Sequence, residues 1–153
     1  FNLLLRSPRM GAKMMALLSY FNEESQVLDP VCRRLAVLVL AREAGATYAW
    51  WTHCRRALAR GEFSQDVIDA INRRAEPPGL DARQQATVAF ARDLARKGRS
   101  SDASFAALRG VMAEDEVVEL IVCCGTYATV AMVLAEGEVG LPEGAVDTLI
   151  RDP

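Results

Sequence analysis

The chain has 153 residues, a formal net charge of −2, 51% hydrophobic residues and 25% charged residues. This length and composition favour one globular domain, spanning residues 1–153, that can bury a sizeable core. The small negative charge gives no reason to expect a nucleic acid or an anionic membrane as a partner. No apolar run is expected to reach the roughly 18 residues of a membrane span.

The first half of the chain shows four helical patterns. Asp29 followed by Pro30 predicts the start of the second helix, because aspartate caps helices and proline fits their first turn. Residues 35–41 are apolar on every side, so this helix should be central and buried. Thr47 is expected to cap the third helix. The predicted ranges are 8–20, 30–44, 47–60 and 64–74.

The second half predicts three more helices after a clear break. Pro77-Pro78-Gly79 is interpreted as a connection between helices and not as a domain boundary. Asp81 caps the fifth helix and Gly98 closes it, whereas Ser101 or Asp102 starts the sixth. The seventh runs from about residue 114 to 136. No strand pattern competes, so the sequence predicts an all-α, single-domain bundle of about six to seven helices.

The four cysteines do not form a recognisable redox or metal motif. They are Cys32, Cys54, Cys123 and Cys124, and no pair has the C-x-x-C spacing. We expect all four to be reduced, as in a cytoplasmic protein, without a disulfide framework and without a metal site.

One histidine, His53, ends a segment rich in aromatic residues. Tyr48, Trp50 and Trp51 precede it within five positions. An imidazole can give or take a proton near neutral pH, and the aromatic side chains could enclose a small unsaturated ligand. The alternative is a histidine that only packs among aromatic rings, because a lone histidine defines no catalytic site.

Several segments in this order resemble the carboxymuconolactone decarboxylase family, which includes the alkylhydroperoxidase D-like (AhpD-like) proteins. The resemblance covers almost the whole chain and implies an AhpD-like fold, with trimers or hexamers of one subunit. The segments that carry it are Asp29-Pro30, Ala44-Gly45 with Tyr48, Trp50 and His53, Ala59-Arg60-Gly61, Gly98 to Asp102, Glu116 to Leu120, Gly125-Thr126-Tyr127 and Val139 to Pro142.

The chain departs from the peroxidase members of that family at three positions. Those members carry E-x11-C-x-x-C-x3-H, and counting back from His53 places the two thiols at Ala46 and Ala49 and the glutamate at Arg34. Thiol–disulfide exchange cannot run without the two sulfurs, so peroxidase activity is not expected. A residual redox role for Cys54, with Cys32 as its partner, is the remaining thiol hypothesis.

The resemblance therefore implies a small-molecule enzyme that needs no cofactor and resembles a decarboxylase or other carbon–carbon lyase. Its substrate would be a carboxylated, cyclic or unsaturated compound. His53 would transfer the proton, and Arg34 would hold the carboxylate unless it pairs with an acid such as Glu43 or Glu119. Arg33 is the next candidate for the anchor. The substrate pocket would be completed by Tyr127 as a hydrogen-bond donor and by Tyr48, Trp50 and Cys54.

Two other functions stay open. The same residues could catalyse isomerisation, dehydration or cyclisation, or the chain could be a non-catalytic ligand-binding or structural homo-oligomer. An enzyme should bring His53, Arg34 and Tyr127 together on one closed pocket. A structural protein should show His53 buried and hydrogen-bonded, with no space beside it.

Overall fold

The computed structural model describes residues 2–151, the side chain of Asn2 excepted. Across this range the chain forms seven α-helices and no strand, which confirms the predicted all-α bundle. A short 3-10 helix, η1 (Asn2–Arg6), and one turn of π-helix, η2 (Tyr20–Glu24), were not predicted. The α-helices are α1 (Pro8–Ser19), α2 (Pro30–Glu43), α3 (Thr47–Ala59), α4 (Gln65–Asn72), α5 (Ala82–Lys97), α6 (Asp102–Arg109) and α7 (Glu114–Glu136).

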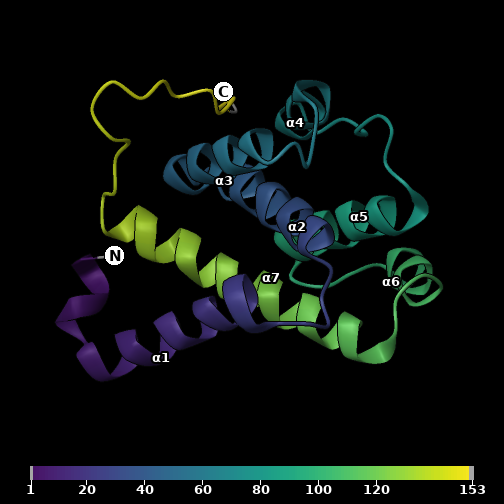
Figure 1. Cartoon of the computed structure of the whole chain (residues 1–153), viewed down its shortest axis with the longest axis horizontal. Helices are drawn as coiled ribbons and strands as arrows, with labels where there is room; N and C mark the ends of the chain where they lie inside the picture. The colour runs from purple at the N-terminus through teal and green to yellow at the C-terminus, as the bar shows by residue number, and fades with distance from the viewer. Residues whose placement is uncertain (1, 152–153) are drawn as a thin grey trace.

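Helix α2 lies at the centre of the bundle, as its apolar composition predicts. It packs against α3, α4, α5 and α7, and α5 also contacts α6 and α7 (Figure 1). Every α2 side chain from Cys32 to Arg42 is buried, including three arginines. The helix that carries Arg33 and Arg34 is therefore surrounded by the other elements, which decides how these charges can be used.

The helix starts agree with the sequence except at α3. The Asp29 carboxylate accepts hydrogen bonds from the backbone N–H groups of Val31 (3.0 Å) and Cys32 (2.8 Å). The prediction for Thr47 was wrong: Thr47 is the first helical residue, and Ala46 occupies the N-cap without a side-chain hydrogen bond. Helix α3, which carries His53, therefore begins without a side-chain cap.

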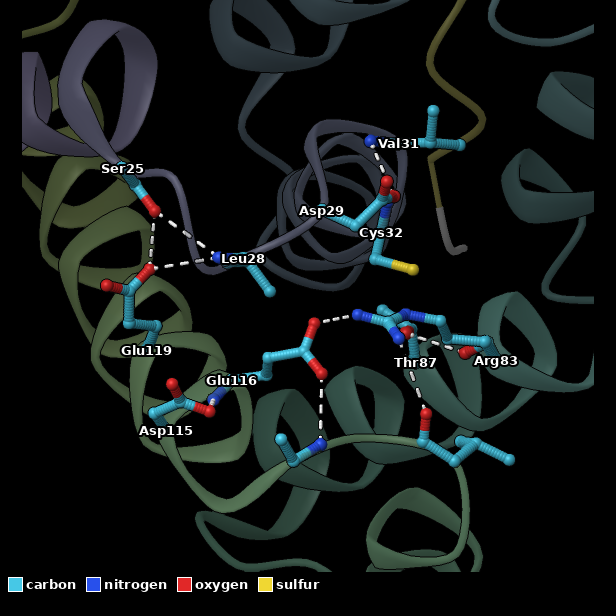
Figure 2. Close-up of polar contacts among 12 residues, drawn as sticks. Ser25, Leu28, Asp29, Val31, Cys32, Arg83, Thr87, Asp115, Glu116 and Glu119 are labelled. Carbon is cyan, nitrogen blue, oxygen red and sulfur yellow. Dashed lines mark hydrogen bonds and ion pairs between the residues drawn. The ribbon is translucent and has the colours of Figure 1, made fainter.

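The segment after α1 is fastened to α7 by one carboxylate. Glu119 accepts hydrogen bonds from the Ser25 hydroxyl (2.5 Å) and the Leu28 backbone N–H (3.2 Å) (Figure 2). It also accepts one from the Tyr20 hydroxyl. Close by, Glu116 accepts from Arg83. These acids of α7 hold neighbouring segments in place, so they are not free to serve a ligand.

Helix α7 is more apolar than the sequence analysis expected. An 18-residue window in it has a mean hydropathy of 2.1, so by length and composition this one helix could cross a membrane. Half of that window is buried within the fold. A long, apolar helix that is partly buried is also typical of the core of a soluble protein. The contacts of α7 with α2, α5 and α6 agree with a core helix.

Candidate functional site

A cavity of about 140 Å³ lies beside His53. A cavity of about 150 Å³ in another protein is large enough to hold benzene, so this one has room for a single six-membered ring. Three helices line it. The lining residues are Leu18 from α1, then Tyr48, Ala49, Thr52, His53 and Arg56 from α3, and Tyr127, Val130 and Leu134 from α7.

The polar side of the cavity is one face of α3. Residues 49, 52, 53 and 56 are spaced three or four apart, so they share one helical face. His53 is 7% exposed. The hydroxyl oxygen of Thr52 is buried without a hydrogen-bond partner among residues 2–151. The cavity therefore offers an imidazole and an unsatisfied hydroxyl side by side, facing the apolar side chains of α1 and α7.

Arg34 fixes the hydrogen-bonding state of His53. Its Nη1 lies 2.8 Å from Nδ1 of His53. A guanidinium has only donors, so Nδ1 must be the acceptor and the proton of the neutral ring must be on Nε2. Arg34 does not line the cavity. It therefore occupies one ring nitrogen from outside and leaves the Nε2–H as the ring's remaining donor.

Arg34 pairs with an acid that the sequence did not single out. Its Nε donates to Glu62 over 3.1 Å, and only 3% of its side chain is exposed. The two acids considered from sequence are engaged elsewhere, because Glu43 pairs with Arg74 and Arg96 and Glu119 holds the segment before α2. Arg34 is thus placed to orient His53. The carboxylate that it binds is that of Glu62 and not that of a substrate.

The surroundings of His53 keep the imidazole neutral. Burial is the largest cause, and it lowers the pKa of His53 from 6.5 to about 3 together with nearby charges. Those charges are the guanidinium groups of Arg34, Arg56 and Arg33. The expectation of an imidazole that changes charge near neutral pH therefore needs revision. At pH 7 this histidine is a neutral hydrogen-bond donor.

Tyr127 meets His53 at the wall of the cavity. The two rings pack edge to face, with centroids 5.4 Å apart and an interplanar angle of 80°. The Tyr127 hydroxyl accepts a hydrogen bond of 3.3 Å from the side-chain amide of Asn22. Burial raises the pKa of this phenol above 10. Tyr127 is therefore a protonated donor at neutral pH, as the sequence analysis expected for its hydroxyl, while its catalytic role stays a prediction.

Two residues proposed from sequence lie away from the cavity. Trp50 is 1% exposed, and its indole N–H donates to the Thr148 hydroxyl over 3.3 Å. Cys54 is buried and does not line the cavity. Tyr48, in contrast, lines it. Of the seven residues proposed, the structure places His53, Tyr127 and Tyr48 on one cavity, and Arg34 directly behind His53.

We predict that the native thiols react slowly. All four cysteines are free and buried. Burial raises the pKa of Cys54 and of Cys124 to about 12, and raises that of Cys123 further. The reactive thiolate is therefore scarce, and a disulfide reagent at pH 8 should modify the native protein at least about 100-fold more slowly than the urea-unfolded protein. A native thiol that reacts as fast as the unfolded chain would contradict this and restore the redox hypothesis.

The site has no evident ligands for a metal ion. Within residues 2–151, no three histidine, cysteine, aspartate or glutamate side chains come together as metal ligands would. The charged groups around His53 are instead mostly arginines.

Three residues of the site were missed from sequence. Thr52 and Arg56 could have been found, because they fall on the helical face of α3 that contains His53. Glu62 could not. It lies after α3 in a segment without a motif, and only the fold brings its carboxylate to Arg34.

No family model matches this sequence, and no curated protein matches it significantly. A solved structure does match: a protein of unknown function from Agrobacterium tumefaciens, named as a candidate antioxidant defence protein, AhpD. The TM-score is 0.81, and the match covers 93% of this chain and 97% of the other. The chain has an AhpD-like fold. At 20% sequence identity, the match extends to the fold alone.

Within the AhpD-like fold, the site of this chain contains features of both an enzyme and a structural protein. His53 and Tyr127 share a cavity, as expected for an enzyme, but Arg34, the third residue expected there, does not line it. His53 is also buried and hydrogen-bonded by Arg34, as expected for a structural histidine. The space beside the ring is the feature that a purely packing histidine does not require.

Proposed function

We propose that this protein is a cofactor-independent enzyme that acts on a small carboxylated molecule by proton transfer, in the manner of a carbon–carbon lyase. The observation that carries the proposal is a buried histidine that accepts a hydrogen bond from Arg34 at Nδ1, lines a partly open cavity and is surrounded by excess positive charge. The cations near His53 are Arg33, Arg34 and Arg56. Among residues 2–151, Arg34 alone of the three pairs with an acid, which is Glu62.

The chemistry follows from where negative charge would develop. When a carboxylate leaves as CO₂, the electrons of the broken carbon–carbon bond move into the adjacent unsaturated system and form an enolate. In this proposal the His53 Nε2–H and the Thr52 hydroxyl donate hydrogen bonds to that enolate oxygen, which is stabilised best by donors fixed in a site without bulk water. The reacting carbon then takes a proton, from water or from the Tyr127 hydroxyl.

Arg56 supports an anionic substrate. It lies at the exposed end of the cavity, and no acid pairs with it within residues 2–151. An unpaired guanidinium at the opening attracts anionic molecules toward the cavity.

The experiment is a screen of carboxylated lactones and unsaturated carboxylic acids in deuterated buffer, followed by proton NMR. A decarboxylation releases CO₂, which a coupled bicarbonate assay measures, and leaves a product with one deuterium at the protonated carbon. We expect His53→Gln to lower turnover by roughly 10²–10³-fold, since that is the usual contribution of one fixed donor to an oxyanion. Cys54→Ala is the matched control, because Cys54 neighbours His53 but does not line the cavity.

Other outcomes of the same screen distinguish the alternatives. A product formed without bicarbonate would indicate an isomerase, dehydratase or cyclase. Turnover that is equal in the wild type and in His53→Gln would contradict a role for His53. Ligand binding without any turnover would indicate a binding protein.

We also propose that the chain forms a homo-oligomer, a trimer or hexamer by resemblance, and acts in the cytoplasm. Large apolar side chains are exposed along α7, among them Val118 at 54% and Met132 at 66%. Met10 of α1 is 60% exposed. Apolar surface of this kind usually marks an interface. Light scattering at about 10 μM should give three or six times the 16.7 kDa of one chain, and a monomer would contradict the proposal.

A further inference from the structure

Arg33 is a buried cation without a counter-ion. Its side chain belongs to the first turns of α2, and 7% of the residue is exposed. Neither a hydrogen bond nor an ion pair joins its guanidinium to any part of the described chain, residues 2–151. The nitrogens of Arg33 are also not among the fully enclosed, unpartnered atoms, which are Thr52 Oγ1 and Arg83 Nε. The side chain is thus buried while its charged end still reaches solvent.

The other buried or half-buried arginines among residues 2–151 each have a partner. Arg42 donates to the backbone carbonyl of Asn72 over 2.6 Å, although it is as buried as Arg33. Each of four more arginines pairs with a glutamate: Arg34 with Glu62, Arg74 with Glu43, Arg83 with Glu116 and Arg92 with Glu76. Removing a charge from water without pairing it costs free energy, so pairing is the rule and Arg33 is the exception.

The neighbours of Arg33 increase this imbalance. Burial and the charge of Arg34 both lower the pKa of Arg33, but a guanidinium stays protonated at any physiological pH. Glu62 is the acid that acts on Arg33, and its carboxylate already contacts Arg34 and Arg60. Arg33 and Arg34 are therefore two adjacent cations near one carboxylate, that of Glu62, which already binds Arg34. An added anion would balance the charge.

We propose that Arg33 binds the carboxylate of a small, ring-sized monoanionic ligand beside the His53 cavity. This inference rests on the proposed function and names the residue that holds the substrate's charge, a role that the sequence analysis assigned first to Arg34. Arg33 does not itself line the cavity, but it is the neighbour on α2 of Arg34, whose guanidinium contacts the ring of His53 that does. The planar fork of the guanidinium matches the two oxygens of a carboxylate.

Benzoate is a suitable probe, with benzamide as its uncharged analogue of the same shape. The tag-free protein is titrated with each, and binding is followed by NMR through the ring signals of His53, the one histidine of the chain. We expect saturable benzoate binding and at least tenfold weaker benzamide binding. Arg33→Gln should weaken benzoate binding at least tenfold, and Arg33→Lys should recover part of it because it restores charge without the fork.

Arg99→Gln is the matched control, since it removes the same charge from an exposed residue. It should bind benzoate like the wild type. Equal benzoate binding by Arg33→Gln and the wild type, or equal binding of benzamide and benzoate, would overturn the proposal. A third result would also overturn it: the wild type does not bind benzoate, and Arg33→Gln dissociates the oligomer. The anion that pairs with Arg33 would then be a carboxylate of a second subunit. Benzoate binding does not depend on turnover, so failure of this proposal and failure of the proposed function can be told apart.

Discussion

Lowering the pH from 6.5 to 4.5 is expected to reduce the free energy of unfolding by about 2.3 kcal/mol through His53 alone. The pKa of an ordinary histidine is 6.5, and that of His53 in the fold is about 3. Between these values the unfolded chain binds a proton that the folded chain does not, so stability falls by about 1.4 kcal/mol per pH unit. His53 is only 7% exposed, so solvent screening is small.

Urea unfolding at pH 6.5, 5.5 and 4.5 measures this loss. Carboxylates also contribute: hydrogen bonds from Lys97, Ser101 and Ser104 lower the pKa of Asp93, and that stability is likewise lost as the pH falls. The carboxylates are unchanged in His53→Gln, so the difference between this variant and the wild type isolates the imidazole. The wild type should lose more stability on acidification than the variant. Parallel losses in the two proteins would show that His53 is not held neutral.

Replacing Arg34 with Met is expected to destabilise the protein by about 3–5 kcal/mol, the usual result of removing one partner from a buried ion pair. The Glu62 carboxylate would lose its guanidinium, and Nδ1 of His53 would lose its donor. The pKa of His53 should rise at the same time, since Arg34 is the strongest of the charges that lower it. Chemical denaturation measures the first effect and an NMR titration of His53 the second.

The double variant Arg34→Met, Glu62→Leu is the control for this prediction. It removes both charges and leaves no uncompensated carboxylate, so it should be more stable than Arg34→Met alone. An Arg34→Met protein within about 0.5 kcal/mol of the wild type would contradict the placement of Arg34 between His53 and Glu62, since changes that small are typical of exposed surface positions.

Local signals in the sequence predicted the helices well. Asp29-Pro30, Asp81 and Gly98 mark helix ends through the geometry of one turn, and all three occupy the expected positions. Thr47 was misassigned because Gly45, with a φ of 63°, ends one turn and the next helix starts directly after Ala46. Cap positions depend on a few residues, so they can be read from sequence with an uncertainty of about one residue.

The chemistry of the site depends on contacts between distant segments, which local patterns do not contain. Trp50 lies next to the cavity residues in sequence, but its indole bonds to Thr148, which is 98 positions away. The choice of Glu62 as the acid beside Arg34, and the burial that keeps His53 neutral, arise in the same way. The residue types were therefore predictable, whereas the protonation state of the histidine and the free charge at Arg33 were not.

The proton on the His53 ring tests the central claim most directly. The chain has one histidine, so a nitrogen–proton correlation spectrum of the tag-free protein contains a single imidazole. If Arg34 donates to Nδ1, that spectrum should show a neutral ring protonated at Nε2, and it should not change between pH 8 and pH 5. A ring protonated at Nδ1, or one that titrates near pH 6.5, would show that His53 is an ordinary imidazole and not a fixed donor.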